Sequence, residues 1–387
     1  MKVSARLAGI SPSLTLEVTS KAKALKKAGV DIVSFAAGEP DFDTPLHIRN
    51  AAKAAIDSGK TRYTPAKGMA ELIEAVREKF RRDNGLEYSP ASIVISCGAK
   101  HSLFNAFQAI CSPGDEVIIP APYWVTYPEQ VRLAGAEPVY LETEESRGYG
   151  IDREKLESLV TERTRAILVS SPCNPTGAAY GRDDLEFIAE LACRRDLSLI
   201  SDEIYEKLVF DGFEAISPAS LGEEVKERTI VVNGVSKTYA MTGWRIGYLA
   251  APENAAKAIS SFQSHSTSNP ATPSQYAALA ALTGDQGCVE EMRRAFQERR
   301  DLMVERLNRI AGITCTVPRG TFYVFPNIAG LGKPSLELAS ELLDQARIAV
   351  VPGAAFGADT NIRMSFADSA ENLNQGLDRL EEYVKTL

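Results

Sequence analysis

The chain is poor in the residues that build metal sites and disulfide frameworks. Its 387 residues include six cysteines and three histidines, and no two cysteines form a Cys-x-x-Cys pair. Scattered thiols of this kind are typical of reduced cytoplasmic proteins, and the histidines lack the spacing of metal ligands. We therefore expect a cytoplasmic protein that binds no metal ion.

Long apolar segments and runs of basic residues are also missing. The N-terminus leads into no apolar stretch, and no segment approaches the roughly 20 apolar residues that cross a bilayer. The net charge is −8, which disfavours nucleic acid and anionic membranes as partners. A composition of 44% hydrophobic and 24% charged residues is that of an ordinary globular protein, so we expect small-molecule partners.

Three familiar catalytic motifs are absent. No Gly-x-Gly-x-x-Gly follows a strand, and the Gly-Leu-Gly-Lys string at 330–333 lacks the spacing of a phosphate-binding loop. No Gly-x-Ser-x-Gly elbow occurs either. These absences disfavour a nicotinamide dehydrogenase, a P-loop enzyme and a serine hydrolase.

Short β-rich runs alternate with helix-like stretches between about residues 90 and 250. This alternation predicts a largely parallel sheet with helices on both faces. In such sheets, ligands bind at the carboxyl ends of the strands. The expected strands are 92–96, 116–120, 137–141, 166–171, 197–201, 229–233 and 246–250.

The last hundred residues have a different pattern. Charged helices at 290–308 and 372–385 flank short strands at 322–325, 349–352 and 362–366. This pattern predicts a smaller α+β domain, which the N-terminal segment joins. We expect an N-terminal segment at 1–43, a large domain at 44–284 and a small domain at 285–387.

Lys237 follows the expected strand 229–233, with Ser236 before it and Arg245 eight positions later. A desolvated lysine near other cations loses its proton more easily and can attack an aldehyde. A hydroxyl and a guanidinium beside it suit a phosphate. A lone lysine in such a place is more often a solvated loop residue, but these neighbours favour a pyridoxal phosphate site.

Asp202 stands at the end of another expected strand, where a buried carboxylate is costly unless it is paired. The protonated ring nitrogen of pyridoxal phosphate is a suitable partner, because that pairing lets the ring accept electrons. Tyr205 follows three residues later and is placed to reach the ring hydroxyl. A capping role for the acid at a helix start is the alternative.

Residues 98–100 and Asn174 also follow expected strands. Free backbone N–H groups after Gly98, at Ala99 and Lys100, suit a phosphate. The same sequence is also compatible with an ordinary strand-to-helix turn that binds no ligand. Asn174 is placed to contact the ring hydroxyl, while Asn-Pro-x-Gly by itself is a common turn. We also expect cis bonds at 174–175 and 121–122.

Trp124 and Arg363 complete the candidate site. Trp124 is one of two tryptophans and follows a strand, so its indole is placed either to stack on the cofactor ring or to fill the core. Arg363 lies in an apolar strand-like run, where its guanidinium fits a substrate carboxylate or a structural ion pair.

Together these strings resemble class I aminotransferases of pyridoxal phosphate fold type I, over essentially the whole chain. The resemblance extends to bacterial aspartate aminotransferases of the beta branch of subgroup I. It rests on seven ordered motifs, at 37–42, 63–65, 122–124, 174–177, 201–205, 236–237 and 241–247.

The resemblance implies an α/β fold with a mostly parallel seven-stranded sheet, a homodimer with shared sites, and a role for each motif residue. Lys237 holds the cofactor and moves the α-proton; Asp202 pairs with the ring nitrogen, Tyr205 and Asn174 with the ring hydroxyl, and Trp124 stacks on the ring. The phosphate is held by Gly98, Ala99, Lys100, Ser236, Arg245 and, from the other subunit, Tyr63. The substrate is held by Gly38, Trp124, Asn174 and Arg363, with Lys100 and Thr15 at its side chain.

Lys100 and Thr15 favour dicarboxylic substrates, so the resemblance implies a ping-pong aspartate aminotransferase that forms oxaloacetate and L-glutamate from L-aspartate and 2-oxoglutarate. Ser11 stands where several prephenate-using relatives carry lysine, and Phe366 where tyrosine is usual. Prephenate, aromatic or alanine transamination and a β-lyase reaction remain as alternatives. An effector-sensing regulator is disfavoured, because we find no basic DNA-binding domain.

Overall fold

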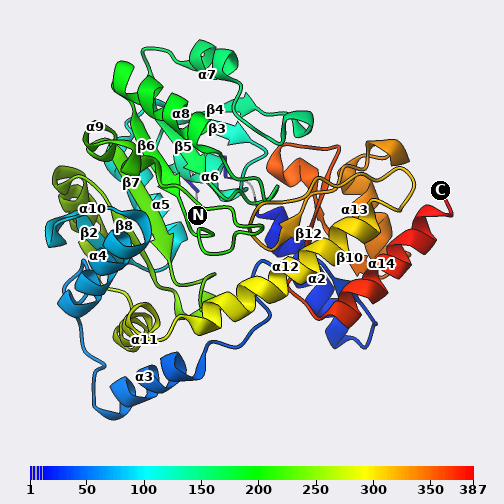
Figure 1. The fold of residues 1–387 in the computed structure, drawn as a ribbon, viewed down its shortest axis with the longest axis horizontal. Helices are drawn as coiled ribbons and strands as arrows, with labels where there is room; N and C mark the ends of the chain where they lie inside the picture. Colours follow the sequence, from blue (N-terminus) through cyan, green and yellow to red (C-terminus); the bar gives the residue numbers. More distant parts are fainter. Residues whose placement is uncertain (2, 5–6, 8, 11) are drawn as a thin grey trace.

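The computed structural model describes residues 1, 3–4, 7, 9–10 and 12–387. Figure 1 shows a central sheet wrapped by helices and, beside it, a smaller group of elements that includes the C-terminus. The sheet has seven strands. In spatial order these are β2 (Ile93–Ser96), β8 (Gly247–Ala250), β7 (Thr229–Gly234), β6 (Ser198–Asp202), β5 (Thr164–Ser170), β3 (Glu116–Ala121) and β4 (Glu137–Glu142).

The sheet is mostly parallel, as predicted. The neighbours from β7 through β6, β5 and β3 to β4 all run parallel, whereas β8 is antiparallel to both β2 and β7. Parallel strands need helical crossovers, which cover both faces of the sheet. The apolar side chains of β3, β5, β6 and β7 are almost completely buried.

Helices pack on both faces of the sheet, and each face has its own apolar core. One core joins the sheet to α5 (Ala99–Ile110), α6 (Thr126–Leu133) and α10 (Glu253–Ser266). Another joins it to α7 (Arg153–Leu159), α8 (Arg182–Arg194) and α9 (Glu223–Lys226). A third core joins the antiparallel strands β2 and β8 to α3 (Leu46–Asp57), α4 (Ala70–Asn84) and α11 (Thr272–Thr283).

The smaller group contains two short sheets. One has the order β11 (Val351–Pro352), β12 (Ile362–Ser365), β9 (Tyr323–Val324). In the other, β1 (Val33–Ser34) pairs in parallel with β10 (Ile348–Ala349), which ties the N-terminal segment to the C-terminal part. Three helices pack around them: α2 (Leu14–Lys27), α13 (Ser335–Asp344) and α14 (Ala370–Val384). The exact domain bounds 1–43, 44–284 and 285–387 stay a prediction.

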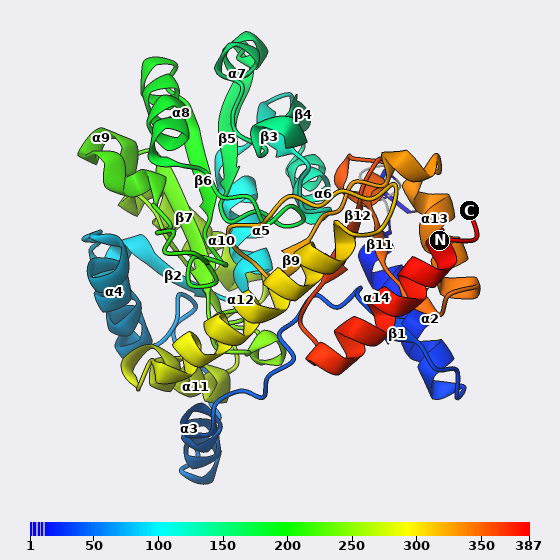
Figure 2. The same ribbon diagram turned by 45° about the vertical axis from the view of Figure 1, so that its right-hand side comes forward.

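Helix α12 (Gly287–Leu307) connects the two groups. In Figures 1 and 2 it runs from beside α11 toward α14. Its Arg300 is buried and donates two hydrogen bonds to Asp211, at 2.7 and 2.9 Å. Its Arg299 pairs with Asp41 at 2.7 Å. These contacts hold the helix against the N-terminal segment and against the segment that follows β6.

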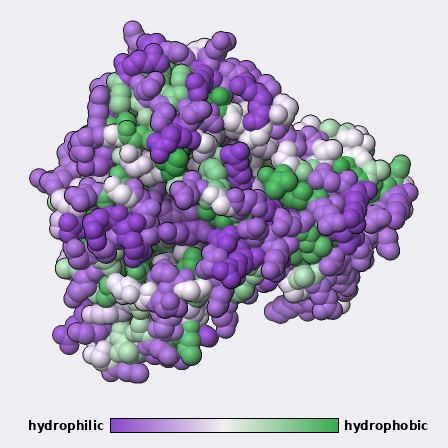
Figure 3. Space-filling view, viewed as in Figure 1, coloured by the Kyte–Doolittle hydropathy of each residue, from purple (hydrophilic) through white to green (hydrophobic). Residues whose placement is uncertain are grey.

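The surface is largely polar. On the face shown in Figure 3, hydrophilic side chains predominate and hydrophobic ones form scattered patches. Within the described part of the chain, no helix combines the length and apolar character needed to cross a bilayer.

The strand register brings the site together. Ser170 at the end of β5 pairs with Asp202 at the end of β6, and Asp202 pairs with Val232 near the end of β7. The loops that follow these three strands therefore leave the sheet at one edge. The predicted cis bonds at 121–122 and 174–175 are present, together with one at 171–172 that the sequence analysis did not predict.

Candidate active site

A cavity of about 400 Å³ opens at this edge of the sheet. Its walls come from α2, from the segment after β1, from the ends of the parallel strands and from β12. Twelve of the residues proposed from the sequence line it: Thr15, Gly38, Ala99, Lys100, Trp124, Asn174, Asp202, Tyr205, Ser236, Lys237, Arg245 and Arg363.

Lys237 lies on the floor of the cavity, where Nζ donates a 2.5 Å hydrogen bond to the backbone oxygen of Gly38. Burial, reinforced by the positive charge of Arg363, lowers the pKa of the Lys237 ammonium to about 8. A substantial fraction of this amine is therefore neutral near physiological pH, as a nucleophile or proton acceptor requires.

Asp202 is buried beside Lys237 and has two donors. The Tyr127 hydroxyl donates to Oδ2 at 2.8 Å, and the backbone N–H of Ile204 donates to Oδ1 at 3.3 Å. Burial raises the pKa of the Asp202 carboxyl to about 6, while the Tyr127 hydrogen bond opposes that rise. An acid in this position is suited to a cationic ring nitrogen, which would stabilise its ionised form.

The start of α5 forms a cradle for an anion. Gly98 precedes the helix with φ of +88° and no side-chain cap, so the first N–H groups of the helix are open. A Cβ on Gly98 would lie 2.6 Å from Arg245 Nη2, and a Cβ on Gly247 would lie 2.2 Å from the backbone nitrogen of Ala99. Only glycine fits at both positions, which lets the guanidinium and the helix start approach each other.

The cations around this cradle have no carboxylate partner among the described residues. Arg245 donates only to backbone oxygens, of Thr242 at 2.8 Å and Cys97 at 3.4 Å. Lys100 Nζ lies 4.8 Å from the Trp124 ring, and burial lowers the pKa of its ammonium. Ser236, also in the cavity wall, is buried. Such uncompensated positive charge is suited to a phosphate.

Arg363 is fully buried at the far side of the cavity. Its Nη1 donates to Asn174 Oδ1 at 3.0 Å and its Nη2 to the backbone oxygen of Ala36 at 3.4 Å. The guanidinium lies 4.2 Å from the centre of the Tyr323 ring. Nε is buried without a partner, so the group retains a free donor for a carboxylate.

Helix α2 forms part of the cavity wall. Thr15 lines it, and its Oγ1 is buried without a hydrogen-bond partner. Ser11 lies outside the described residues. Phe366 is buried in the core between Phe210 and Phe296, where an apolar ring needs no hydrogen-bond partner and an added hydroxyl would.

Tyr63 is not part of the cavity of its own chain. It lies in the segment between α3 and α4, and its side chain is 90% exposed. Gly98 also does not line the cavity, but it directly precedes Ala99, which does.

Nine further residues of the cavity wall had no role assigned from the sequence, among them Lys23, Glu39, Tyr127 and Tyr323. Tyr127 had a usable signal only in its closeness to Trp124, which it follows by three positions at the start of α6. Tyr323 had none, since it reaches the site through the pairing of β9 with β12.

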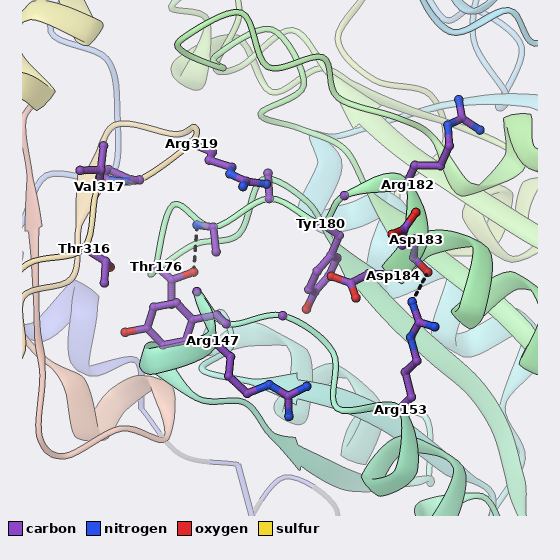
Figure 4. A pocket seen from close by; sticks show the side chains of 17 residues that line it. Arg147, Arg153, Thr176, Tyr180, Arg182, Asp183, Asp184, Thr316, Val317 and Arg319 are labelled. Carbon is purple, nitrogen blue, oxygen red and sulfur yellow. Dashed lines mark hydrogen bonds between the residues drawn. The ribbon is translucent and has the colours of Figure 1, made fainter.

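A second cleft, of about 630 Å³, lies near α7 and α8 and is lined by four arginines. Figure 4 shows the side chains of this cleft, with Arg153 hydrogen-bonded to the backbone oxygen of Asp183. Arg147 pairs with Asp152 at 3.0 Å. Arg182 pairs with Glu186 at 3.4 Å, and none of the described residues that line the cleft is a lysine. The chemistry of the chain is concentrated in the cavity around Lys237.

The sequence matches the family described as aminotransferase class I and II over residues 30–380. The chain belongs to this family. It is 46% identical to the aspartate aminotransferase of Geobacillus stearothermophilus over 391 residues, which cover all of this chain and 99% of that protein. It is 47% identical to the aspartate/prephenate aminotransferase of Cereibacter sphaeroides over 392 residues, 98% of each.

A solved structure shows the same fold. The aspartate aminotransferase from Thermus thermophilus with maleate matches with a TM-score of 0.96 and 45% identity, covering 99% of each chain. The protein is therefore an aminotransferase of fold type I, and its cofactor is pyridoxal 5′-phosphate. The site fits that cofactor: an amine with a lowered pKa, a buried acid and an anion cradle surround one cavity.

Proposed function

We propose that this aminotransferase transfers the amino group of L-aspartate to 2-oxoglutarate and releases oxaloacetate and L-glutamate. One observation carries the proposal: besides Lys237 and Arg245, which we assign to the cofactor, the cavity wall includes Arg363 and Lys100, neither of which pairs with a carboxylate in the described chain. A dicarboxylic substrate has one carboxylate for each. The Thermus structure with maleate, also a dicarboxylate, supports the same assignment.

We assign the cofactor contacts as follows. Lys237 holds the cofactor, Asp202 pairs with its ring nitrogen, and Trp124 lies against the ring. Pyridoxal phosphate supplies an electron sink for the pair that the departing α-proton leaves behind. The remaining contacts are Tyr205 and Asn174 at the ring hydroxyl, and the backbone of Gly98, Ala99 and Lys100 with the side chains of Ser236 and Arg245 at the phosphate.

The substrate is positioned by Arg363 and proton transfer is carried by Lys237. The Arg363 fork and the backbone of Gly38 hold the α-carboxylate, which turns the α-hydrogen toward the amine. Lys237 Nζ takes that proton as general base. Its lowered pKa keeps enough of the amine neutral at working pH. Asn174, hydrogen-bonded to Arg363, fixes the guanidinium plane.

We infer that the enzyme acts as a cytoplasmic homodimer in which Tyr63 completes the phosphate site of the partner subunit. The exposure of Tyr63, at 90%, supports this assignment because an aromatic ring so exposed is suited to an interface. Leu46 and Ile56 on the preceding helix α3 are also exposed apolar residues.

The absorption spectrum of the purified enzyme tests the proposal. With cofactor bound, we expect a visible band that bleaches on addition of L-aspartate and returns with 2-oxoglutarate. A band that ignores aspartate would keep the cofactor assignment and overturn the substrate. Absence of any band after pyridoxal phosphate is supplied would overturn the role of Lys237.

Prephenate is the second candidate acceptor, because the Cereibacter relative is named for both activities. The same spectral assay separates the two. Return of the band with prephenate after bleaching by aspartate or glutamate would show the wider specificity. Return with 2-oxoglutarate alone would exclude prephenate as an acceptor.

A further inference from the structure

Tyr127 lies beside Asp202 and lines the same cavity. It is in the first turn of α6 and its side chain is 2% exposed. Its hydroxyl lies 2.8 Å from Asp202 Oδ2 and 3.0 Å from Ser170 Oγ. The phenol therefore joins the ends of two adjacent parallel strands, β5 and β6.

The direction of these hydrogen bonds follows from the groups involved. An ionised carboxylate only accepts, and a phenol has a single proton to donate. Tyr127 therefore donates to Asp202, and the Ser170 hydroxyl is left to donate to the Tyr127 oxygen. Burial raises the pKa of Tyr127 well above its usual value, so the phenol keeps its proton and stays a donor.

The ring of Tyr127 has a second neighbour in the site. It meets the Trp124 indole edge to face, with centroids 5.3 Å apart and planes at 82°. The backbone N–H of Tyr127 donates to the Trp124 oxygen at 3.0 Å. One side chain thus contacts both the acid and the indole that we assign to the cofactor ring.

We propose that Tyr127 is a positioning residue: its hydroxyl holds Asp202 ionised and aimed at the cofactor ring nitrogen, and its ring sets the indole of Trp124. This inference rests on the proposed role of Asp202. It does not depend on which amino acid is the substrate.

The energetics at Asp202 support this role. Burial favours the neutral carboxyl, and the Tyr127 hydrogen bond is the largest influence in the opposite direction, ahead of Ile204 N–H and Lys237. Without the hydroxyl, the neutral acid becomes more favourable. A neutral acid would hold the ring nitrogen less firmly, and the ring would accept electrons less well.

The experiment uses Tyr127→Phe, which keeps the ring and removes only the hydroxyl. The loss of a hydrogen bond to a charged group predicts an affinity of the apo-protein for pyridoxal phosphate that is about 10- to 100-fold weaker. We expect kcat to fall by a similar factor, with KM for the amino donor nearly unchanged. Tyr127→Leu should weaken binding further, since Trp124 loses its support.

Two comparisons make the result specific. Tyr248→Phe is the matched control: Tyr248 is a buried tyrosine in β8 that packs on Phe80 at 5.8 Å, and we expect it to change neither quantity. Reconstitution with N-methylpyridoxal phosphate, whose ring nitrogen is permanently cationic, should reduce the kcat deficit of Tyr127→Phe.

Unchanged cofactor affinity and kcat in Tyr127→Phe would overturn the inference. So would a kcat deficit of the same size with the methylated cofactor, because that deficit would not arise at the ring nitrogen. If the wild-type enzyme bound the cofactor but ignored aspartate, only the proposed substrate would fail, and the affinity comparison would still decide the role of Tyr127.

Discussion

The Arg363 guanidinium donates a 3.0 Å hydrogen bond to the side-chain oxygen of Asn174. The two residues are 189 positions apart in the sequence. Asn174 follows a strand of the central sheet, and Arg363 lies in β12 of the smaller group. The contact therefore joins the part of the molecule that we assign to the cofactor with the part that we assign to the substrate.

Replacement of Lys237 by alanine should abolish turnover. The change removes both the amine that holds the cofactor and the base, so we expect kcat to fall by several orders of magnitude and the visible band to disappear. Absorbance and a coupled oxaloacetate assay measure the two effects. Lys155→Ala is the control, because Lys155 is an exposed lysine of α7; near-normal turnover in Lys237→Ala would end the assignment.

Arg363→Ala should mainly weaken substrate binding. Loss of a buried charge pair costs about 2–5 kcal/mol, which would appear as a large rise in KM for aspartate in steady-state kinetics. Arg363→Lys keeps the charge but loses the planar fork of the guanidinium. Its KM for aspartate should therefore lie between that of the wild-type enzyme and that of Arg363→Ala. An unchanged KM in Arg363→Ala, with a lower melting temperature, would identify the arginine as structural.

Lys100→Met should reduce discrimination for dicarboxylic donors. Methionine has a similar length without the charge, and loss of a hydrogen bond to a carboxylate costs about 1.5–3 kcal/mol. We expect kcat/KM for aspartate to fall about 10- to 100-fold relative to that for alanine. An equal fall for both donors would place Lys100 at the cofactor instead of the substrate side chain.

Mixed subunits should test the shared site. Tyr63→Ala and Lys237→Ala should each be impaired as homodimers. A hybrid of the two contains one intact site, with Lys237 from one subunit and Tyr63 from the other, so the activity of the purified hybrid should approach half that of the wild type. Size-exclusion chromatography with light scattering verifies the dimer. No recovery in a confirmed hybrid would place Tyr63 outside the site of the partner.

The pKa of Lys237 predicts a pH dependence for loading of the apo-protein. Its value of about 8 lies below the ordinary lysine value, and the neutral amine is the nucleophile. The rate of covalent attachment of pyridoxal phosphate should therefore rise with pH and level off above about pH 8, where an unperturbed lysine would continue to rise to about 10.4. Stopped-flow absorbance measures this rate. A profile that climbs through pH 9 without levelling would contradict the lowered pKa.

Much of the fold could be predicted from the sequence, because buried parallel strands correspond to short apolar segments that are followed by polar residues. The strand expected at 229–233 is β7, Thr229–Gly234, and the helix expected at 290–308 is α12, Gly287–Leu307. The antiparallel direction of β8 was not predicted, because periodicity does not give the orientation of a strand.

The site residues were identified through local motifs, and the misses follow from that. Tyr127 and Tyr323 act through contacts that strand order and helix packing create, so neither belongs to a local string of polar residues. Glu39, which accepts a 2.8 Å hydrogen bond from Thr242, lay inside a motif but had no assigned chemistry. Exposure of Tyr63 is likewise a property of the folded chain.

The open donor of Arg363 also bears on the folding stability of the protein. A buried donor without an acceptor costs roughly 1–3 kcal/mol of folding stability, and Arg363 Nε and Thr15 Oγ1 are both in that state. A bound dicarboxylate would satisfy such groups and add its own binding energy to the folded state. The enzyme with a bound dicarboxylate should therefore be harder to unfold than the enzyme without one.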